Sequence, residues 1–178
     1  MAKANLLWVD LEMTGLDPQV DQIIEVAAIA TTSDLAEVAR YSASVRADRN
    51  FMLQRMATPF WQDHAASHDH LIQNSTSAQA KPASLVEQEL VKFIATNFDT
   101  SQPIYLAGNS VHQDRKFITK TWPQVDQLLN YRLLDVSSWK IIFEHHNIKF
   151  AKKECHRALD DIEESIAELQ YYLKKVTF

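Results

Sequence analysis

The chain has 178 residues, and 18 Lys and Arg against 23 Asp and Glu give it a net charge of −5. This length predicts one domain spanning residues 1-178 with a substantial core. Proteins that grip long nucleic acid through many phosphates usually have a basic surface, so tight binding of long nucleic acid is not expected. The absence of a membrane-length apolar run and of a signal-peptide pattern, together with a single cysteine, Cys155, predicts a cytoplasmic protein.

Asp10 and Glu12 lie at the end of the first predicted strand, which begins at Leu6 and is followed by the turn residue Gly15. Residues two apart on a strand point to the same face, so the two side chains project together. Neighbouring carboxylates repel unless a cation lies between them, and their oxygens suit Mg²⁺ or Mn²⁺. The alternative is an edge strand whose acids are simply hydrated.

The first half of the chain predicts an antiparallel opening followed by short helices. Residues 23–31 and 34–45 supply the second and third strands. Glu25 on the second could approach the acidic pair, but an acid at such a position more often faces solvent or a structural partner. Residues 51–56 and 59–71 favour short helices, and 74–82 a loop. Trp61 could stack on a nucleobase or pack in the core.

The second half alternates helix and strand, which predicts an α/β mixed sheet flanked by helices. Ser84 and Glu87 form a capping-box pattern before a helix, and Ser110 with Gln113 forms another. The second box places Asp114 in the first turn of its helix, at the end of the strand 103–107. A third carboxylate near the carboxyl end of a strand suits a ligand site. The alternative is structural, because an acid in the first turn of a helix also interacts favourably with the helix dipole. A strand over 131–136 and a helix over 137–146 follow.

The last predicted helix, residues 157–174, separates two neighbouring acids. Its apolar residues recur at helical spacing, and on a 100° wheel Asp161 lies roughly 100° from the centre of that face while Asp160 lies about 160° away. Asp161 is therefore expected to reach toward the sheet and Asp160 to point to solvent. His156 precedes the helix and is either a catalytic group near the same acids or a structural or hydrated side chain.

Taken together, these motifs resemble the DEDDh exonucleases of the ribonuclease H-like fold. The first motif is Asp-x-Glu-x-Thr-Gly from Asp10, Asp114 supplies the third acid, and the last is His-x-Ala-x-x-Asp from His156 to Asp161. Four longer stretches, at residues 8–17, 108–117, 131–137 and 158–165, are similar to the oligoribonuclease family.

That resemblance implies a homodimeric 3′-to-5′ exoribonuclease that cuts very short RNA, dinucleotides above all, to nucleoside 5′-monophosphates at the last step of RNA degradation. Two divalent ions, Mg²⁺ or Mn²⁺, about 3.5–4 Å apart would clamp the attacking and leaving oxygens. The implied residues are the metal ligands Asp10, Glu12, Asp114 and Asp161, the general base His156, and the substrate-binding residues Leu16, Trp61, Ser110, Tyr131, Arg132 and Ser137.

In that resemblance Leu16 wedges against the bases, Trp61 packs on the substrate, and Tyr131 reaches the partner subunit's site. Ser110, Arg132 and Ser137 surround the 5′ phosphate. The family often has a His where this chain has Ala66, with His64, His68 and His70 nearby as replacements. The competing functions are a proofreading-type DNA exonuclease of the same superfamily and an inactive nucleic-acid-binding module on this fold.

Overall fold

The computed structural model describes residues 3–151 and 157–176. Its centre is a five-stranded mixed sheet in the order β3-β2-β1-β4-β5. β1 is antiparallel to β2 and β2 to β3, whereas β4 is parallel to β1 and β5 to β4. The strands are β1 (Leu6–Met13), β2 (Ile23–Thr31), β3 (Glu37–Ser44), β4 (Tyr105–Gly108) and β5 (Leu133–Asp135). The predicted antiparallel opening is confirmed.

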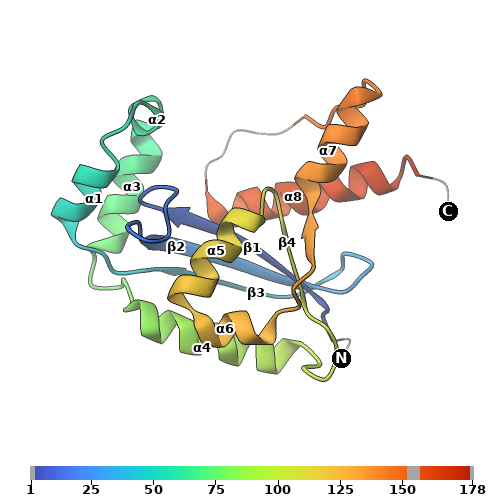
Figure 1. Cartoon of the computed structure of the whole chain (residues 1–178), viewed down its shortest axis with the longest axis horizontal. Helices are drawn as coiled ribbons and strands as arrows, with labels where there is room; N and C mark the ends of the chain where they lie inside the picture. Colours follow the sequence, from blue (N-terminus) through green and yellow to red (C-terminus); the bar gives the residue numbers. More distant parts are fainter. Residues whose placement is uncertain (1–2, 152–156, 177–178) are drawn as a thin grey trace.

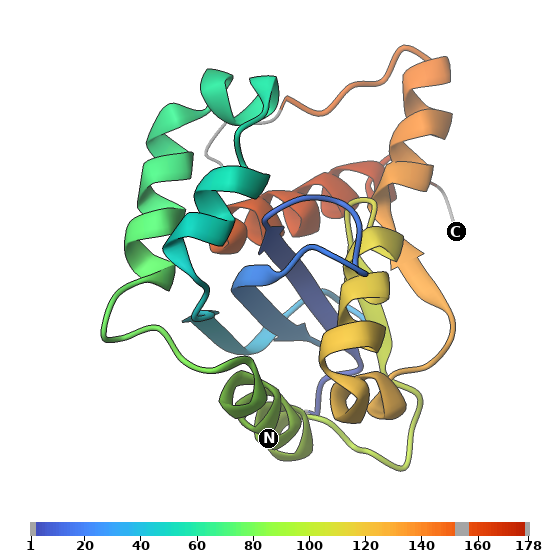
Figure 2. The same cartoon turned by 60° about the vertical axis from the view of Figure 1, so that its left-hand side comes forward.

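Helices cover both faces of this sheet, and Figure 1 shows α8 on one side with α4 and α6 on the other. Three short helices, α1 to α3, stand together beside the β1–β2 loop (Figure 2). The helices are α1 (Arg49–Arg55), α2 (Pro59–Asp63), α3 (Ala65–Ser75), α4 (Ala83–Asn97), α5 (His112–Thr121), α6 (Pro123–Leu128), α7 (Val136–His145) and α8 (Ala158–Leu173).

The two faces of β1 belong to different parts of the core. Leu7, Val9 and Leu11 pack with buried residues of α4, α5 and α6. Leu6 and Trp8 pack with α7 and α8, and the Trp8 side chain is fully buried. Since side chains alternate along a strand, the next residues on the α8 face are the acids Asp10 and Glu12. The acids therefore extend an apolar row that lies under α8.

Both predicted capping boxes are wrong, because tertiary contacts use the side chains that would form them. Helix α4 begins after Pro82 without a side-chain cap, and the Glu87 carboxylate instead accepts a hydrogen bond from the Gln124 backbone N–H at 2.7 Å. Helix α5 begins after Val111, also without a side-chain cap, and the Gln113 amide instead donates to the Leu16 carbonyl. Asp114 nevertheless lies in the first turn of α5, as predicted.

Within residues 3–151 and 157–176, no helix combines the length and apolar character needed to cross a membrane.

Candidate active site

Three carboxylates from the two ends of the chain meet at the end of β1. One oxygen each from Asp10, Glu12 and Asp161 can be chosen so that all three lie within 4.8 Å of one another. Asp10 and Glu12 come from the α8 face of β1, and Asp161 comes from the first turn of α8. The helical-wheel prediction for Asp161 is confirmed, because the helix packs its apolar residues Ala158, Ile162 and Leu169 on the sheet. Asp160 is partly buried but outside this group of three.

The electrostatics of this cluster are unfavourable for three anions. Burial, then the charges of Asp114, Glu12 and Asp161, raise the pKa of Asp10 well above its ordinary value. Burial and the charges of Glu25 and Asp161 raise the pKa of Glu12 to about 8. Carboxylates held this closely favour a proton or a cation among them. Their oxygen-only donor set fits a hard divalent ion such as Mg²⁺ or Mn²⁺.

Asp114, in the first turn of α5, contacts the same strand. Its Oδ1 accepts the backbone N–H of Leu11 at 3.1 Å, and the side chain is buried. Burial raises the pKa of Asp114 to about 7, although hydrogen bonds from its own N–H and that of Leu11 oppose the shift. Asp114 therefore lies close enough to raise the pKa of Asp10, although it is outside the group of three.

Glu25 is a further acid near the cluster, the less favoured of the two positions considered for it from the sequence. It lies directly opposite Glu12 in the β1–β2 register, so both side chains project from the α8 face. Burial raises the pKa of Glu25, and the charges of His70 and Arg157 partly offset this. Glu25 therefore adjoins the acidic cluster and has structural partners as well. Strand parity alone could have revealed this once the β1–β2 pairing was known.

A cavity of about 580 Å³ opens beside Glu12, between the β1–β2 loop and helix α2. Its lining includes Leu16 and Trp61, the two residues predicted to contact substrate bases, together with Arg55 and Phe60. Leu16 is 74% exposed at the tip of its loop, and Trp61 is half-buried. The structure thus brings both predicted residues next to the acidic cluster, through the shared residue Glu12.

The loop that carries Leu16 is fixed by Asp21, a residue that sequence reasoning missed. The Asp21 carboxylate is buried and accepts hydrogen bonds from the Thr14 hydroxyl, the Asp17 backbone N–H and the Arg55 guanidinium. Although burial opposes ionisation, these bonds together lower the pKa of Asp21. A Cβ at Gly15 would lie 2.5 Å from Asp21 Oδ2, so only glycine fits there.

Ser110 and Ser137, predicted to surround a terminal phosphate, are adjacent in space. Their hydroxyl oxygens lie 3.2 Å apart, and the Ser110 backbone N–H donates to both Ser137 Oγ and Asp135 Oδ1. Ser110 has a positive φ of 50°, a conformation that is uncommon for a residue with a Cβ. These hydrogen bonds therefore fix the turn between β4 and α5 and place the hydroxyl groups of Ser110 and Ser137 side by side, near the carboxyl ends of β4 and β5.

Arg132 and Tyr131 precede β5 and are both exposed. The Arg132 guanidinium lies 5.3 Å from the centre of the Tyr131 ring, a cation–π distance. Tyr131 is 77% exposed, which leaves it available to a partner molecule.

Among the histidines considered as replacements at Ala66, His70 acts electrostatically on Glu25, and His64 lies beside Glu12. His64 lines a small cavity together with Glu12, Phe60 and Trp61. His68 lies beside Asp69, and the Asn74 amide is hydrogen-bonded to His70. The predicted general base His156, like Cys155, lies outside the described residues.

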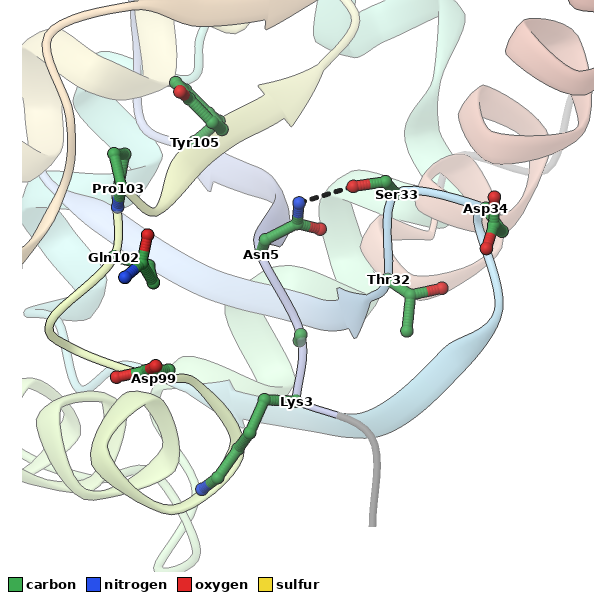
Figure 3. A pocket seen from close by; sticks show the side chains of 10 residues that line it. Lys3, Asn5, Thr32, Ser33, Asp34, Asp99, Gln102, Pro103 and Tyr105 are labelled. Carbon is green, nitrogen blue, oxygen red and sulfur yellow. Dashed lines mark hydrogen bonds between the residues drawn. The ribbon is translucent and has the colours of Figure 1, made fainter.

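A second cavity, of about 560 Å³, lies at the opposite end of the sheet (Figure 3). Lys3, Asn5, Asp99 and Tyr105 are among the side chains that line it. The Asn5 amide donates to Ser33 Oγ, while its buried Oδ1 accepts no hydrogen bond from the part of the chain that the structure describes. None of the predicted site residues lines this cavity, so the site considered below is the one at Glu12.

Comparisons with known proteins identify related sequences. Residues 7–169 match the family described as Exonuclease. An oligoribonuclease from Francisella tularensis subsp. tularensis is 38% identical over 174 residues, which cover 97% of this chain and 96% of the relative. An oligoribonuclease from Neisseria meningitidis serogroup B is 37% identical over 174 residues, covering 96% and 91% of the two chains.

Solved structures of exonuclease I share the fold. The enzyme from Methylocaldum szegediense aligns with a TM-score of 0.65 at 14% identity, over 96% of this chain and 40% of that one. A zinc-bound complex of E. coli ExoI with single-stranded DNA aligns with a TM-score of 0.64 at 13% identity, over 98% and 41%. This chain thus spans about two fifths of their length. The predicted ribonuclease H-like fold is confirmed.

Proposed function

Because the chain belongs to the oligoribonuclease family of exonucleases, we propose that it hydrolyses very short RNA from the 3′ end. Dinucleotides are its main substrates, and nucleoside 5′-monophosphates are its products. The observation that carries this proposal is the convergence of Asp10, Glu12 and Asp161 within 4.8 Å, with Asp114 beside them. Residues 1-178 then act as one exonuclease domain in the cytoplasm.

Asp10, Glu12, Asp114 and Asp161 would hold two divalent ions, Mg²⁺ or Mn²⁺. When bound, such ions supply an activated water and offset negative charge on the phosphate. The fit rests on the donor set and on charge. Burial and neighbouring acids raise the pKa values of Asp10 and Glu12, and burial raises that of Asp114, so a nearby cation would stabilise their ionised forms.

His156 accepts the proton of the attacking water, since an imidazole has a near-neutral intrinsic pKa. The water oxygen bonds to phosphorus, and the bond from phosphorus to the 3′ oxygen of the preceding nucleotide breaks. That 3′ oxygen takes up a proton from solvent water and leaves as a hydroxyl, the terminal nucleotide departs with a 5′ phosphate, and His156 returns its proton to solvent.

In this proposal the preference for dinucleotides comes from the contacts made with the 5′ phosphate. Ser110 and Ser137 present adjacent hydroxyl groups there, and Arg132 supplies a positive charge. A third nucleotide would have to displace these charge-assisted contacts with the terminal phosphate. With a net charge of −5, the chain has little to gain from the additional phosphates of longer RNA.

A second copy of the chain completes the proposed site as a homodimer. Tyr131 is 77% exposed and reaches toward the partner's phosphate site in this proposal. Ile141 and Ile142 on α7 are 70% and 60% exposed, which suits a helix that a second copy covers. Sedimentation of the purified chain should show a dimer; a monomer that retains full activity would remove Tyr131 from the site.

The test is single-turnover cleavage of 5′-labelled RNAs from two to about ten nucleotides, at a salt concentration fixed because phosphate contacts are screened. Wild type should be fastest on the dinucleotide and slower on a matched DNA dinucleotide. Arg132→Ala should lower the cleavage rate most on the dinucleotide, so that the rates for short and long RNAs become more similar. Arg49→Ala, at the exposed start of α1, is the matched control. A wild-type rate that rises with RNA length would contradict the proposal.

A further inference from the structure

The cavity beside Glu12 has a polar edge that its expected role in base stacking does not require. Of the described residues that line it, Arg55 is the only basic one. Most of the remaining lining is apolar or aromatic, including Leu16, Phe60 and Trp61. Arg55 lies at the end of α1, and Figure 2 shows this helix beside the β1–β2 loop.

The Arg55 guanidinium is fixed in one orientation. Its Nε donates to Asp21 Oδ1 at 2.8 Å and its Nη2 to Asp21 Oδ2 at 3.1 Å. The Asp21 side chain is 1% exposed, whereas that of Arg55 is 40% exposed. Asp21 is itself anchored by Thr14 and the Asp17 backbone, so the guanidinium is tied to the loop that carries Leu16.

This side-on pairing uses only one edge of the guanidinium. Arginine has five N–H donors in a planar fork, and Asp21 takes the Nε–Nη2 edge. The Nη1–Nη2 edge has no hydrogen-bond partner among the described residues. Because the buried Asp21 carboxylate already balances the charge of Arg55, this edge is better suited to neutral acceptors than to phosphates.

Phe60 provides a surface on which a base can stack. Its ring is stacked on His64 at a centroid distance of 4.5 Å and meets Trp61 edge-on at 5.1 Å. Phe60 is nevertheless 56% exposed. An aromatic ring that is held by neighbours yet remains open stacks readily on a nucleobase.

We propose, on the basis of the function proposed above, that Phe60 stacks on the 3′-terminal nucleobase and Arg55 selects guanine at that position. The scissile phosphate belongs to the 3′-terminal nucleotide, and Glu12 lines both the cavity and the acidic cluster. The base of that nucleotide therefore enters this cavity. A parallel pair of arginine N–H groups matches the O6 and N7 acceptors of guanine, whereas adenine offers an amino group in place of O6.

The experiment measures kcat/KM for four 5′-phosphorylated RNA dinucleotides that differ only in the 3′ base. Wild type should prefer guanine over adenine by about tenfold, as expected for one bidentate contact. Arg55→Met should abolish this preference, which is measured as the ratio of kcat/KM for guanine to that for adenine within the same variant. Phe60→Ala should lower all four, by about tenfold for one lost stacking contact. Arg49→Met, which removes the same charge from the same helix, should behave as wild type.

Loss of the Asp21 ion pair could disturb folding, so Arg55→Lys is a second variant. Lysine keeps a cation beside Asp21 but lacks the planar fork, and it should also lose the guanine preference while the thermal midpoint is kept. A uniform loss on all four dinucleotides in Arg55→Met and Arg55→Lys would make Arg55 a structural residue and overturn the inference.

Calorimetric binding of GMP and AMP separates this inference from the proposed function. Wild type should bind GMP about tenfold more tightly than AMP, and Arg55→Met should bind both alike. Preferential binding of GMP without RNA cleavage would refute the nuclease function and leave the base preference standing. Equal binding of the two monophosphates by wild type would refute the base preference even if RNA is cleaved.

Discussion

Replacing Glu12 with Gln should stabilise the metal-free chain while removing one proposed metal ligand. The pKa of Glu12 is about 8 in the folded chain, against an ordinary value of 4.5. Folding therefore favours the protonated form, and stability falls as pH rises from about 4.5 to about 8. At pH 7 the loss in the free energy of unfolding is about 3 kcal/mol, because pH 7 is about 2.5 units above the ordinary pKa of 4.5 and each unit is worth about 1.4 kcal/mol. Glutamine keeps the shape of the side chain without this cost.

The assay is thermal unfolding in EDTA between pH 4 and pH 8. For a chain of this size about 3 kcal/mol corresponds to a rise in midpoint on the order of 10 °C, so Glu12→Gln should unfold higher than wild type at pH 7. The two midpoints should converge near pH 4, where glutamate is protonated in both states. Saturating Mg²⁺ should stabilise wild type more than the variant and shrink the difference.

Asp34→Asn is the control for loss of a carboxylate, because Asp34 lies exposed in the turn between β2 and β3. It should leave the midpoint almost unchanged in EDTA. If Glu12→Gln is no more stable than wild type at pH 7, or if Mg²⁺ leaves its advantage intact, the cost inferred for ionising Glu12 among buried acids is wrong.

Three further outcomes follow from the site. EDTA should abolish cleavage and Mg²⁺ or Mn²⁺ restore it, and a folded Asp114→Asn variant with full activity would refute the metal assignment. Asp161→Asn should lose activity by orders of magnitude at saturating metal while Asp160→Asn loses little, so equal losses would contradict the geometry of α8. His156→Asn should slow cleavage by roughly 10²–10⁴-fold and flatten the acidic limb of the pH–rate profile, and an unchanged profile would exclude a general base.

Periodicity was sufficient to predict the parts of the site that depend on one element. Strand alternation placed Asp10 and Glu12 on one face, and the apolar stripe of the last helix turned Asp161 toward them. Both inferences rest on the local geometry of a strand or a helix, which the order of side chains determines.

Contacts between elements could not be read in this way. Glu25 joined the acidic region only because the β1–β2 register sets it opposite Glu12. The cap pattern at Ser84 failed because Glu87 bonds to the backbone of Gln124, which is 37 residues further along the chain. The pairing of Asp21 with Arg55 likewise spans 34 residues and carries no local pattern.

The acidic cluster joins β1 to α8, the first strand and the last helix of the described chain. During synthesis, residues 1–160 can leave the ribosome before the carboxylate of Asp161 exists in the exposed chain. Bringing such distant segments together also requires closing a long loop, so we expect this contact to form late in folding. If Asp161 is a metal ligand as proposed, a nascent chain that ends before it is unable to cut RNA near the messenger from which it is translated.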